Sequence, residues 1–533
     1  MIENTLFPTE AEIPAQYKVK PVEQRTYLIN GEIRTWAGQQ QEVLSPIYTR
    51  NEQGLTRVRL GSVPMLDEKE SLSALEAATA AYKNGWGRMS AKQRIGYVEG
   101  FLDRMVKVRE PVIRGLMWEI GKSAKDATTE FDRTVDYVRE TITALKDMVH
   151  ADSKFIRVDG HLAQNRRSPF GKALCVGPFN YPLNETFTTL IPALLMGNTV
   201  IFKPAKYGIL FHNEMMEAYR DSFPAGVINT VYGDGGTVLG PLMRSGEIDL
   251  LAFIGSTKVG NILTKQHPKP NLQTILGLGA KNPCFVLQDA DLDLAAQEAV
   301  AGSLSYNGQR CTALKTLYVH RAVAEKFTEK FVEKVEKLNW GMPWTPNVNI
   351  TPLPEEGKVG FMQEYVTDAL AKGAVMANSR GSNSLESFFA PTVLFNVNPQ
   401  MNIFHNEQFG PVVPIVVFED LNEPMKYVSA SQICGQQASI FSYDEHVVGP
   451  LIDKLAFEVC RINLNGQCKR GPDSLPFTGR KTSAVNVLSI TDALKVCAIR
   501  TGVVTPINDK NLALVRRITQ GRHSKFMESD HLV

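Results

Sequence analysis

Residues 171–208 read "GKALCVGPFNYPLNETFTTLIPALLMGNTVIFKPAKYG", and this stretch decides the fold class. Within it, "ALCVG" and "TVIFKP" are short apolar runs that predict buried strands, and the segment between them predicts a helix. Farther along the chain, "GVINTVYGDGG" and "DLLAFIGS" continue the same alternation. Short apolar strands that alternate with helices are typical of a parallel, doubly wound sheet with helices on both faces. The sequence therefore predicts an α/β fold.

The flanking segments differ in pattern. Residues 1–65 are polar and interrupted by prolines, which predicts an arm with short strands, whereas residues 68–150 repeat apolar side chains at helical spacing. Residues 154–168 are basic and strand-like. A second α/β stretch covers residues 277–475 and contains the amphipathic segment "VAEKFTEKFVEKVEKL". The charged tail after residue 505 is expected to be solvated or to contact another subunit.

Bulk composition excludes several classes of protein. A chain of 533 residues predicts two or three domains, and 43% hydrophobic with 21% charged residues is ordinary for a globular protein. The net charge of +2 gives no reason to expect nucleic acid or an acidic membrane as partner. The seven cysteines are spread singly, which suits a reducing compartment and predicts neither disulfides nor a metal site. The apolar runs are far shorter than the roughly 20 residues of a membrane span. We expect a cytoplasmic protein.

One cysteine stands out from the others. Cys311 lies in "SYNGQRCTALK" (305–315), among polar and flexible neighbours that include Arg310 and Thr312. A free cysteine is usually a small buried hydrophobe, and this interpretation suits the other six. A cationic neighbour or a helix N-terminus would favour the thiolate, which is the reactive form. For Cys311, the sequence leaves the nucleophile and the packing residue as equal alternatives.

Polar residues follow several of the predicted strands. Asn180 in "GPFNYP" either caps a helix or donates to an oxygen that becomes negative when a thiolate adds to a carbonyl. Lys203 and Lys206 in "VIFKPAK" lie at the carboxyl edge of the predicted sheet, where ligands tend to bind, and suit an anion. The turn "GDGGTVLG", which begins at Gly233, is glycine-rich but lacks the GxGxxG spacing. "FIGSTKVG" (253–260) offers another strand-to-helix turn.

These motifs occur together and in order with three others: "LGLGAKNP", "HNEQFGPVVP" and "FTGRK". The set resembles the aldehyde dehydrogenase superfamily over roughly residues 25–505, and "SYNGQRCTALK", "NYP" and "RGPDSLPF" are most similar to its non-phosphorylating, NADP-dependent glyceraldehyde-3-phosphate dehydrogenases. The resemblance implies three parts and a tail: a dinucleotide-binding domain (1–149 and 169–276), a catalytic domain (277–479), a β oligomerisation arm (150–168 and 480–507) and a C-terminal tail (508–533). It also implies a homodimer or homotetramer.

The family mechanism assigns roles to these residues. Cys311 would add to a small-molecule aldehyde as a thiolate, while Asn180 and the Cys311 backbone N–H hold the oxyanion. Hydride transfer to a nicotinamide would leave a thioester, which water cleaves. The resemblance places the cofactor at seven positions: Lys203, Lys206, Gly233, Gly255, Ser256, Glu407 and Phe409.

Lys206 decides the expected cofactor. NAD-preferring members carry a glutamate at this position, which accepts hydrogen bonds from the ribose hydroxyls. A lysine cannot accept such a bond and would instead pair with a 2′-phosphate. We therefore expect NADP, with NAD as the second choice.

The substrate is expected to be anionic. Arg133, Tyr181, Arg310 and Arg470 match the phosphate-binding positions of the glyceraldehyde-3-phosphate branch, and Thr312 lies next to the cysteine. Three arginines in one pocket would be costly to gather without an anion. The best single expectation is oxidation of glyceraldehyde 3-phosphate to 3-phosphoglycerate. A semialdehyde dehydrogenase, in which the arginines hold a carboxylate, is the alternative.

One position departs from the family pattern. The deacylating glutamate should lie 34 residues before Cys311 (311 minus 277), but Gly277 stands there and residues 271–288 contain no glutamate. A glycine cannot accept a proton from water, and general-base assistance is typically worth about 10²–10⁴ in rate. Three hypotheses follow: another group supplies the base, a thiol such as coenzyme A releases the acyl group, or the protein is a weak enzyme that mainly binds nucleotide.

Overall fold

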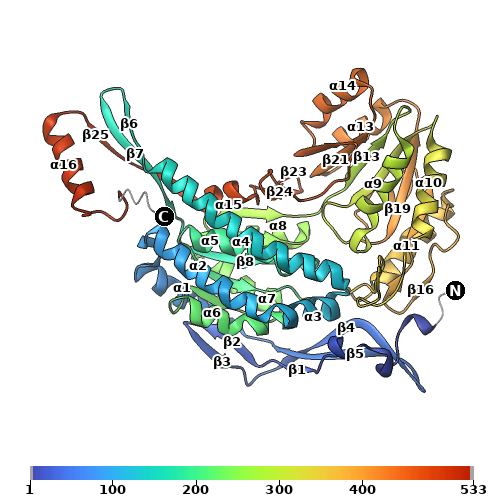
Figure 1. Ribbon diagram of the computed structural model, residues 1–533, viewed down its shortest axis with the longest axis horizontal. Coiled ribbons are helices and arrows are strands. Elements are labelled where there is room, and N and C mark those ends of the chain that lie inside the picture. The colour runs from blue at the N-terminus through green and yellow to red at the C-terminus, as the bar shows by residue number, and fades with distance from the viewer. Residues whose placement is uncertain (1–3, 528–533) are drawn as a thin grey trace.

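The computed structural model describes residues 4–527, which form two neighbouring α/β layers and a projecting arm (Figure 1). The first sheet has six strands in the order β10-β9-β8-β11-β12-β24, all parallel except the last. From β8 the chain adds β9 and β10 on one side of the sheet and then β11 and β12 on the other. The sheet is therefore doubly wound. The strands are β8 (Lys172–Val176), β9 (Thr199–Lys203), β10 (Ile228–Thr230), β11 (Leu250–Ile254), β12 (Gln273–Gly277) and β24 (Ala484–Val485).

The helices around this sheet include those predicted from the helical spacing of apolar residues. Residues 68–152 form four of them, and α5, between β8 and β9, has every residue buried. The prediction of a strand–helix–strand unit in residues 171–208 is confirmed. The helices are α1 (Glu68–Lys83), α2 (Ala91–Met105), α3 (Arg109–Ile120), α4 (Ala124–Asp152), α5 (Asn184–Leu195), α6 (Met216–Ser222), α7 (Gly235–Arg244), α8 (Thr257–Gln266) and α15 (Ile490–Val496).

The second sheet has seven strands in the order β15-β18-β19-β14-β13-β21-β22, all parallel except β15. Its strands are β13 (Asn282–Val286), β14 (Leu314–His320), β15 (Val375–Met376), β18 (Thr392–Phe395), β19 (Val412–Phe418), β21 (Gln437–Phe441) and β22 (Arg461–Leu464). Its helices are α9 (Leu292–Leu304), α10 (Ala324–Glu336), α11 (Lys358–Ala371), α12 (Asn402–His405), α13 (Asn422–Ala430) and α14 (Glu445–Leu455). Two small ladders complete the layer: β16 (Ser384–Leu385) with β17 (Phe388–Phe389), and β20 (Cys434–Gly435) with β23 (Arg480–Lys481).

The N-terminal region differs from the expected short strands. Besides β1 (Val22–Glu23), β2 (Thr26–Ile29) and β3 (Glu32–Thr35), it contains the long hairpin of β4 (Gln40–Asn51) and β5 (Gly54–Pro64). The prolines suggested interruptions, but Pro46 lies where the β4–β5 register shifts and Pro64 ends β5. A proline at a bulge or a strand end removes no ladder hydrogen bond, so the hairpin continues past it.

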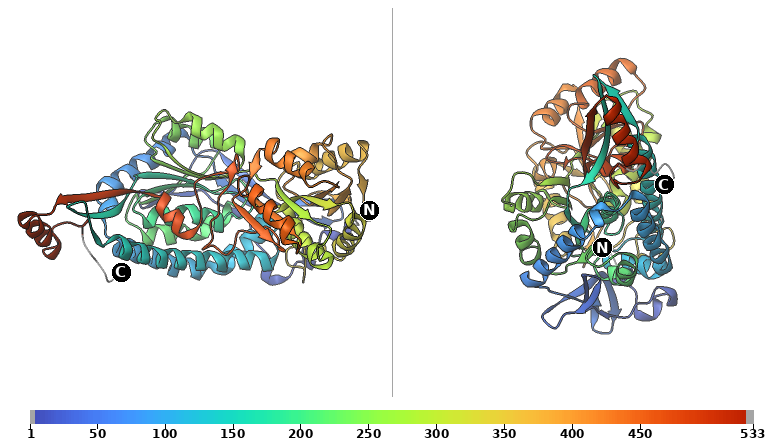
Figure 2. Two further views of the ribbon diagram at one scale, coloured as in Figure 1. Left: turned by 90° about the horizontal axis from the view of Figure 1, so that it is seen from above. Right: turned by 90° about the vertical axis from the view of Figure 1, so that its left-hand side faces the viewer.

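The arm is an antiparallel sheet of β25 (Ala498–Pro506), β7 (His161–Pro169) and β6 (Phe155–Val158), and it projects away from both layers (Figure 2). Beyond it, the tail predicted as polar forms α16 (Asp509–Gln520), which has no buried residue. The chain then returns toward the body, and Met527 is buried. The remainder of the predicted tail, 528–533, lies outside the described residues.

These observations confirm the predicted fold class, an α/β protein with two parallel sheets and a small β arm. The exact domain boundaries stay a prediction. Across residues 4–527, no helix is both long enough and apolar enough to cross a membrane.

Candidate functional site

A cavity of about 600 Å³ lies between the two layers and is lined from both. The first layer contributes the turns that follow β8, β11 and β12, and the second contributes the segments before β14 and β19 and after β22. The cavity brings together eleven of the predicted site residues: Arg133, Asn180, Tyr181, Gly255, Ser256, Arg310, Cys311, Thr312, Glu407, Phe409 and Arg470. Their roles stay predictions, but their convergence is a property of the fold.

The turn after β8 is shaped by close packing. A Cβ at Gly177 would lie 1.8 Å from the Thr186 hydroxyl oxygen, so only glycine lets the strand pass this close to α5. The turn then presents Asn180, whose Nδ2 donates to the Gln309 carbonyl at 2.8 Å. Gln309 lies two residues before Cys311, so this bond ties the amide of one layer to the cysteine segment of the other.

Lys122 and Glu130 hold the Asn180 turn from beneath. Their buried side chains form an ion pair, and Lys122 Nζ also donates to the Asn180 carbonyl at 2.8 Å. Glu130 Oε1 accepts from the backbone N–H groups of Leu183 and Asn184 at 3.0 and 3.1 Å. This carboxylate therefore caps the start of α5, which has no cap from its own sequence. Neither residue was predicted, because their partners lie far away in the sequence.

Cys311 follows a segment in an uncommon conformation. Tyr306 and Asn307 have φ of 49° and 56°, a region that non-glycine residues seldom adopt. Two sets of hydrogen bonds hold them there: the Tyr306 hydroxyl donates to the Ile120 carbonyl at 3.0 Å, and the Asn307 side chain bonds Thr351. The segment places Cys311 half-buried in the cavity wall, whereas five of the other cysteines are buried.

The surroundings of the Cys311 thiol do not favour the thiolate, as a cationic neighbour would. Burial, followed by the charge of Glu185, raises the pKa of the Cys311 thiol to about 11, and Gln436 and Arg470 only partly oppose this. Arg310 donates instead to the carbonyls of Ala301 and Gly302 at 3.0 and 2.7 Å. The adjacent arginine is therefore not among the groups that most affect the pKa of the thiol.

The predicted substrate arginines have carboxylate partners. Arg133 forms a two-pronged pair with Asp473, at 2.9 Å from Nε and 2.6 Å from Nη2. Arg470 donates to Glu185 at 2.5 Å and to Asp473 at 3.2 Å. Arg310 pairs with no carboxylate among residues 4–527. Three guanidinium charges against two carboxylates leave one net positive charge in this group.

The flank around Gly277 is apolar. A Cβ there would meet Ile254 at 3.3 Å and Leu488 at 3.6 Å, so no polar side chain replaces the missing glutamate at this point. Two residues on, a Cβ at Gly279 would lie 3.1 Å from Glu407 Oε2. Glu407 Oε1 lies 3.4 Å from Lys315 Nζ, and the same ammonium lies 4.6 Å from the centre of the Phe409 ring. Lys315, buried and unpredicted, thus positions both residues.

The predicted cofactor residues follow the carboxyl ends of adjacent parallel strands. Ser256 caps α8, accepting from Val259 N–H at 3.3 Å, and a Cβ at Gly255 would lie 2.7 Å from the Phe253 ring. A helix N-terminus approached by bare backbone suits a phosphate group. The residues present therefore fit a dinucleotide.

Three predicted cofactor residues do not line the cavity. Lys203 ends β9, and burial lowers its pKa to about 8, opposed by the charge of Asp234. Lys206 is exposed in the next loop, and Gly233 precedes Asp234, which caps α7. These positions share the sheet edge with Gly255 and Ser256, as expected for residues that follow neighbouring parallel strands.

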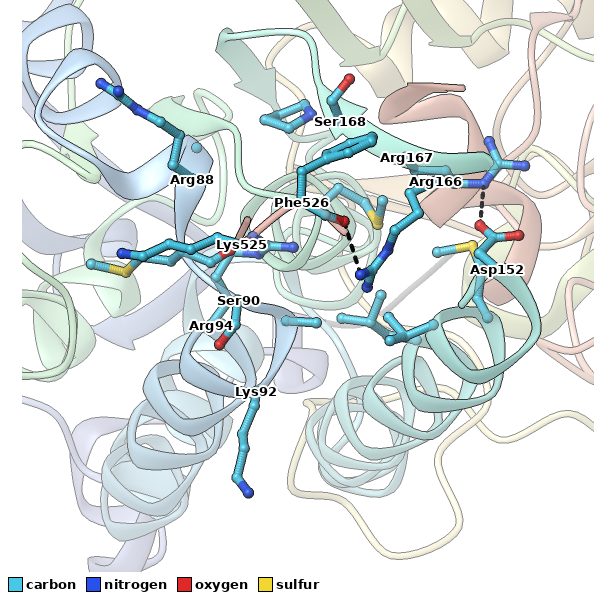
Figure 3. Close-up of a pocket in the computed structure, with 18 of the residues that line it drawn as sticks. Arg88, Ser90, Lys92, Arg94, Asp152, Arg166, Arg167, Ser168, Lys525 and Phe526 are labelled. Atoms are coloured by element: carbon cyan, nitrogen blue, oxygen red, sulfur yellow. Dashed lines mark hydrogen bonds and ion pairs between the residues drawn. The ribbon is translucent and has the colours of Figure 1, made fainter. Parts of the chain in front are cut away.

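A second cavity, of about 740 Å³, lies at the base of the arm (Figure 3). There Arg166 of β7 donates to the Phe526 carbonyl at 2.9 Å, and Arg167 pairs with Asp152 at 3.6 Å. Within residues 4–527, no predicted site residue lines it, so the cavity that contains Cys311 is the candidate active site. Among residues 4–527, no group of three or more His, Cys, Asp or Glu side chains could hold a metal ion.

Comparison with known proteins gives a family. The sequence model described as "Aldehyde dehydrogenase family" matches residues 40–500. The chain is 33% identical over 442 residues to the NADP-dependent glyceraldehyde-3-phosphate dehydrogenase of Streptococcus equinus, covering 82% of this chain and 90% of that protein. It is 30% identical over 437 residues to the succinate-semialdehyde dehydrogenase [NADP(+)] GabD of Escherichia coli, covering 80% and 88%.

A solved structure agrees with these relatives. The NADP-dependent glyceraldehyde-3-phosphate dehydrogenase of Bacillus halodurans, complexed with NADP, superposes with a TM-score of 0.83 at 33% identity. The match covers 91% of this chain and all of the other.

Proposed function

Because the chain belongs to the aldehyde dehydrogenase family, we propose that it oxidises an anionic, phosphorylated aldehyde with NADP, and that the reaction is glyceraldehyde 3-phosphate to 3-phosphoglycerate. The observation that carries this proposal is the shared cavity: Cys311, Arg310 and Arg470 open onto one space. The relatives named for this activity support it, because they align with more than four-fifths of the chain.

The residues divide the chemistry among them. Cys311 attacks the aldehyde carbon as a thiolate. Asn180 Nδ2 gives up its hydrogen bond to the Gln309 carbonyl and donates instead to the aldehyde oxygen, which becomes negative. When bound, NADP supplies the hydride acceptor. Phe409 and Glu407 form the wall on the cofactor side, and Thr312 and Tyr181 line the cavity beside the thiol.

Two observations support NADP in place of NAD. Lys203 and Lys206 put cations at the sheet edge where a dinucleotide would lie, and the relatives above are named for NADP. Lys206 is exposed, so its ammonium is free to approach a 2′-phosphate. Asp234, whose charge acts on Lys203, has a carboxylate that could accept a hydrogen bond from the ribose.

Carboxylates already balance most of the guanidinium charge in the cavity, which favours a second candidate, a semialdehyde. A phosphate monoester carries about −1.5 to −2 charges at pH 7, whereas a carboxylate carries one. The group of Arg133, Arg310, Arg470, Glu185 and Asp473 has one net positive charge, although an exposed Lys469 adds another at the cavity wall. A relative named succinate-semialdehyde dehydrogenase also matches.

We also propose that the protein forms a homodimer or homotetramer through the arm. Ile156, Val158, Ile499 and Val504 of the arm are each about half exposed, at 47–59%. An apolar surface on a projecting sheet is costly in water and typical of an interface. Light scattering of the purified protein measures the assembly.

The decisive experiment measures NADPH formation with glyceraldehyde 3-phosphate and with succinic semialdehyde, each with NADP and with NAD. We expect NADPH to form, with a larger kcat/KM for the phosphorylated aldehyde, and a burst of about one NADPH per site wherever thioester release is slower than hydride transfer. A preference for succinic semialdehyde would support the second candidate. The absence of NADPH formation with either aldehyde would contradict aldehyde oxidation.

A further inference from the structure

The thioester on Cys311 needs a group that can deprotonate water, and the flank of Gly277 offers none. Ile254 and Leu488 close that side. Among residues 4–527, the carboxylates that line the cavity are Glu185, Glu355 and Glu407. A carboxylate that replaces the missing base from within the cavity must therefore be one of these three.

Two of the three are engaged on the other side of the cavity. Glu407 lies beside Gly279 and is 3.4 Å from the buried Lys315, next to the Phe409 ring, where the cofactor is expected. Glu355 pairs with Lys358 at 3.2 Å, and Lys358 itself lies 5.8 Å from the Phe409 ring centre. Both carboxylates belong to the wall that a nicotinamide would cover.

Glu185 lies on the substrate side. It is in the first turn of the fully buried α5, so its backbone cannot move away from the cavity. Its Oε2 accepts from Arg470 at 2.5 Å, and no protein group among residues 4–527 donates to its Oε1. Among the charged groups, Glu185 has the largest effect on the pKa of the Cys311 thiol, and both residues line the same cavity.

We propose that Glu185 replaces the missing glutamate: its Oε1 accepts a proton from the water that cleaves the Cys311 thioester. The inference rests on the proposed function, since it requires that the thioester forms. The water oxygen bonds to the thioester carbon, its proton passes to Glu185, and the carbon–sulfur bond breaks to give the acid and the Cys311 thiolate. Glu185 then returns the proton to solvent. No oxidant or reductant takes part.

The charges around Glu185 suit this role. Burial is the largest influence and raises the pKa of Glu185; Arg470 and Arg133 oppose this shift, and Asp473 and Glu130 add to it. A base is most effective when its pKa is near the working pH, so a carboxylate with a raised pKa accepts a proton better than an exposed one. Arg470 also fixes the carboxylate orientation, leaving Oε1 as the open lone-pair site.

The test separates acylation from release in the full-length protein. Wild type and Glu185→Gln are mixed with NADP and whichever aldehyde the wild type oxidises; NADPH is followed in real time, and the masses of the quenched proteins are measured by intact mass spectrometry. We expect Glu185→Gln to show a burst near one NADPH per site, to lose about 10²–10⁴-fold in steady-state rate, and to accumulate acyl groups on Cys311. The matched control, Glu140→Gln, removes an exposed carboxylate of α4 that lies outside the cavity and should release product at the wild-type rate.

Four outcomes contradict the proposal. A Glu185→Gln steady state within threefold of wild type removes Glu185 from the reaction. A wild type that itself stalls after the burst, or that turns over only with added coenzyme A, shows that water is not activated, although oxidation stands. The absence of a burst in folded Glu185→Gln assigns the residue to an earlier step. No NADPH formation by the wild type overturns oxidation as well. If Glu185→Gln does not fold, Glu185→Asp, with its shorter reach, must show the same slow release.

Discussion

Arg470 donates to Glu185 at 2.5 Å inside the cavity that contains Cys311, and both side chains are more than nine-tenths buried. The pair gives the cavity a cation whose charge is already balanced before any substrate enters. An incoming anion must therefore compete with Glu185 for Arg470, or bind mainly to Arg310, whose guanidinium holds only backbone carbonyls. This arrangement leads to the first two predictions.

Removal of Arg470 should destabilise the protein. Arg470→Leu leaves Glu185 buried without its partner, and breaking a buried pair from one side typically costs about 3–5 kcal/mol. Denaturant unfolding followed by tryptophan fluorescence measures the loss. The double variant Arg470→Leu/Glu185→Leu removes both charges and should recover most of it; an equally unstable double variant would show that packing, and not charge, holds this region.

Arg310→Gln should weaken binding of the anionic group without preventing chemistry. A hydrogen bond to a charged group contributes about 1.5–3 kcal/mol, so KM for glyceraldehyde 3-phosphate should rise roughly 10- to 150-fold. Unphosphorylated glyceraldehyde is the matched control, because it has no anion to lose. An equal rise in KM for both aldehydes would mean that Arg310 serves the segment that holds Cys311 and not the substrate.

Alkylation of Cys311 should report its raised pKa. Burial and Glu185 keep the thiol neutral at pH 7, so its rate with iodoacetamide should climb with pH up to about pH 11 in the unliganded protein. Glu185→Gln removes the negative charge, lowers the thiol pKa and moves this profile to lower pH. Cys311→Ala identifies the signal, since Cys460 is also half-buried. A profile that does not move in Glu185→Gln would place the two groups too far apart to interact.

Lys206→Glu should change the cofactor preference. The new carboxylate would repel a 2′-phosphate and could accept from a 2′-hydroxyl, so KM for NADP should rise at least tenfold while KM for NAD falls. Lys206→Gln is the control for loss of charge alone and should raise KM for NADP less. Unchanged NADP kinetics in Lys206→Glu would move the 2′-phosphate site to another cation.

Gly277→Glu should rescue a protein that lacks Glu185. Gly277 has no positive φ, and the atoms nearest to its Cβ would be those of the Ile254 and Leu488 side chains, at 3.3–3.6 Å, so a side chain fits there once Ile254 shifts by a few tenths of an ångström. In the Glu185→Gln background we expect Gly277→Glu to raise the steady-state rate at least tenfold. Gly277→Gln controls for the added volume. A rescue by glutamine as strong as that by glutamate would exclude proton transfer by residue 277.

The sequence predicted the elements and the convergence of the site, because both follow from local patterns. Apolar runs such as 173–177 identify strands, and residues that follow parallel strands necessarily meet at one sheet edge, as Asn180 and Gly255 do. The partners of those residues were not predictable in this way. Nothing in the sequence sets Glu185 apart from the other polar residues at the start of α5, and only the fold places Arg470 against it, 285 residues away.

The buried Lys122 and Lys315 illustrate the same limit. A lysine in a sequence predicts a solvated surface, since charged side chains are seldom fully buried unless paired. Both are buried here because Glu130 and Glu407 meet them from other elements. The long β4–β5 hairpin was missed for a different reason: a proline signals an interruption, and only the register shows that Pro46 falls at a bulge.

The bond from Asn180 to the Gln309 carbonyl spans two separately wound layers, since Asn180 follows β8 and Gln309 precedes β14. Nucleophile and oxyanion donor therefore keep their spacing only while the layers stay in register with each other. Mild heat or pressure that shifts one layer relative to the other should abolish catalysis while the circular dichroism of the whole protein stays native. Loss of activity would then report how firmly the two layers are held together.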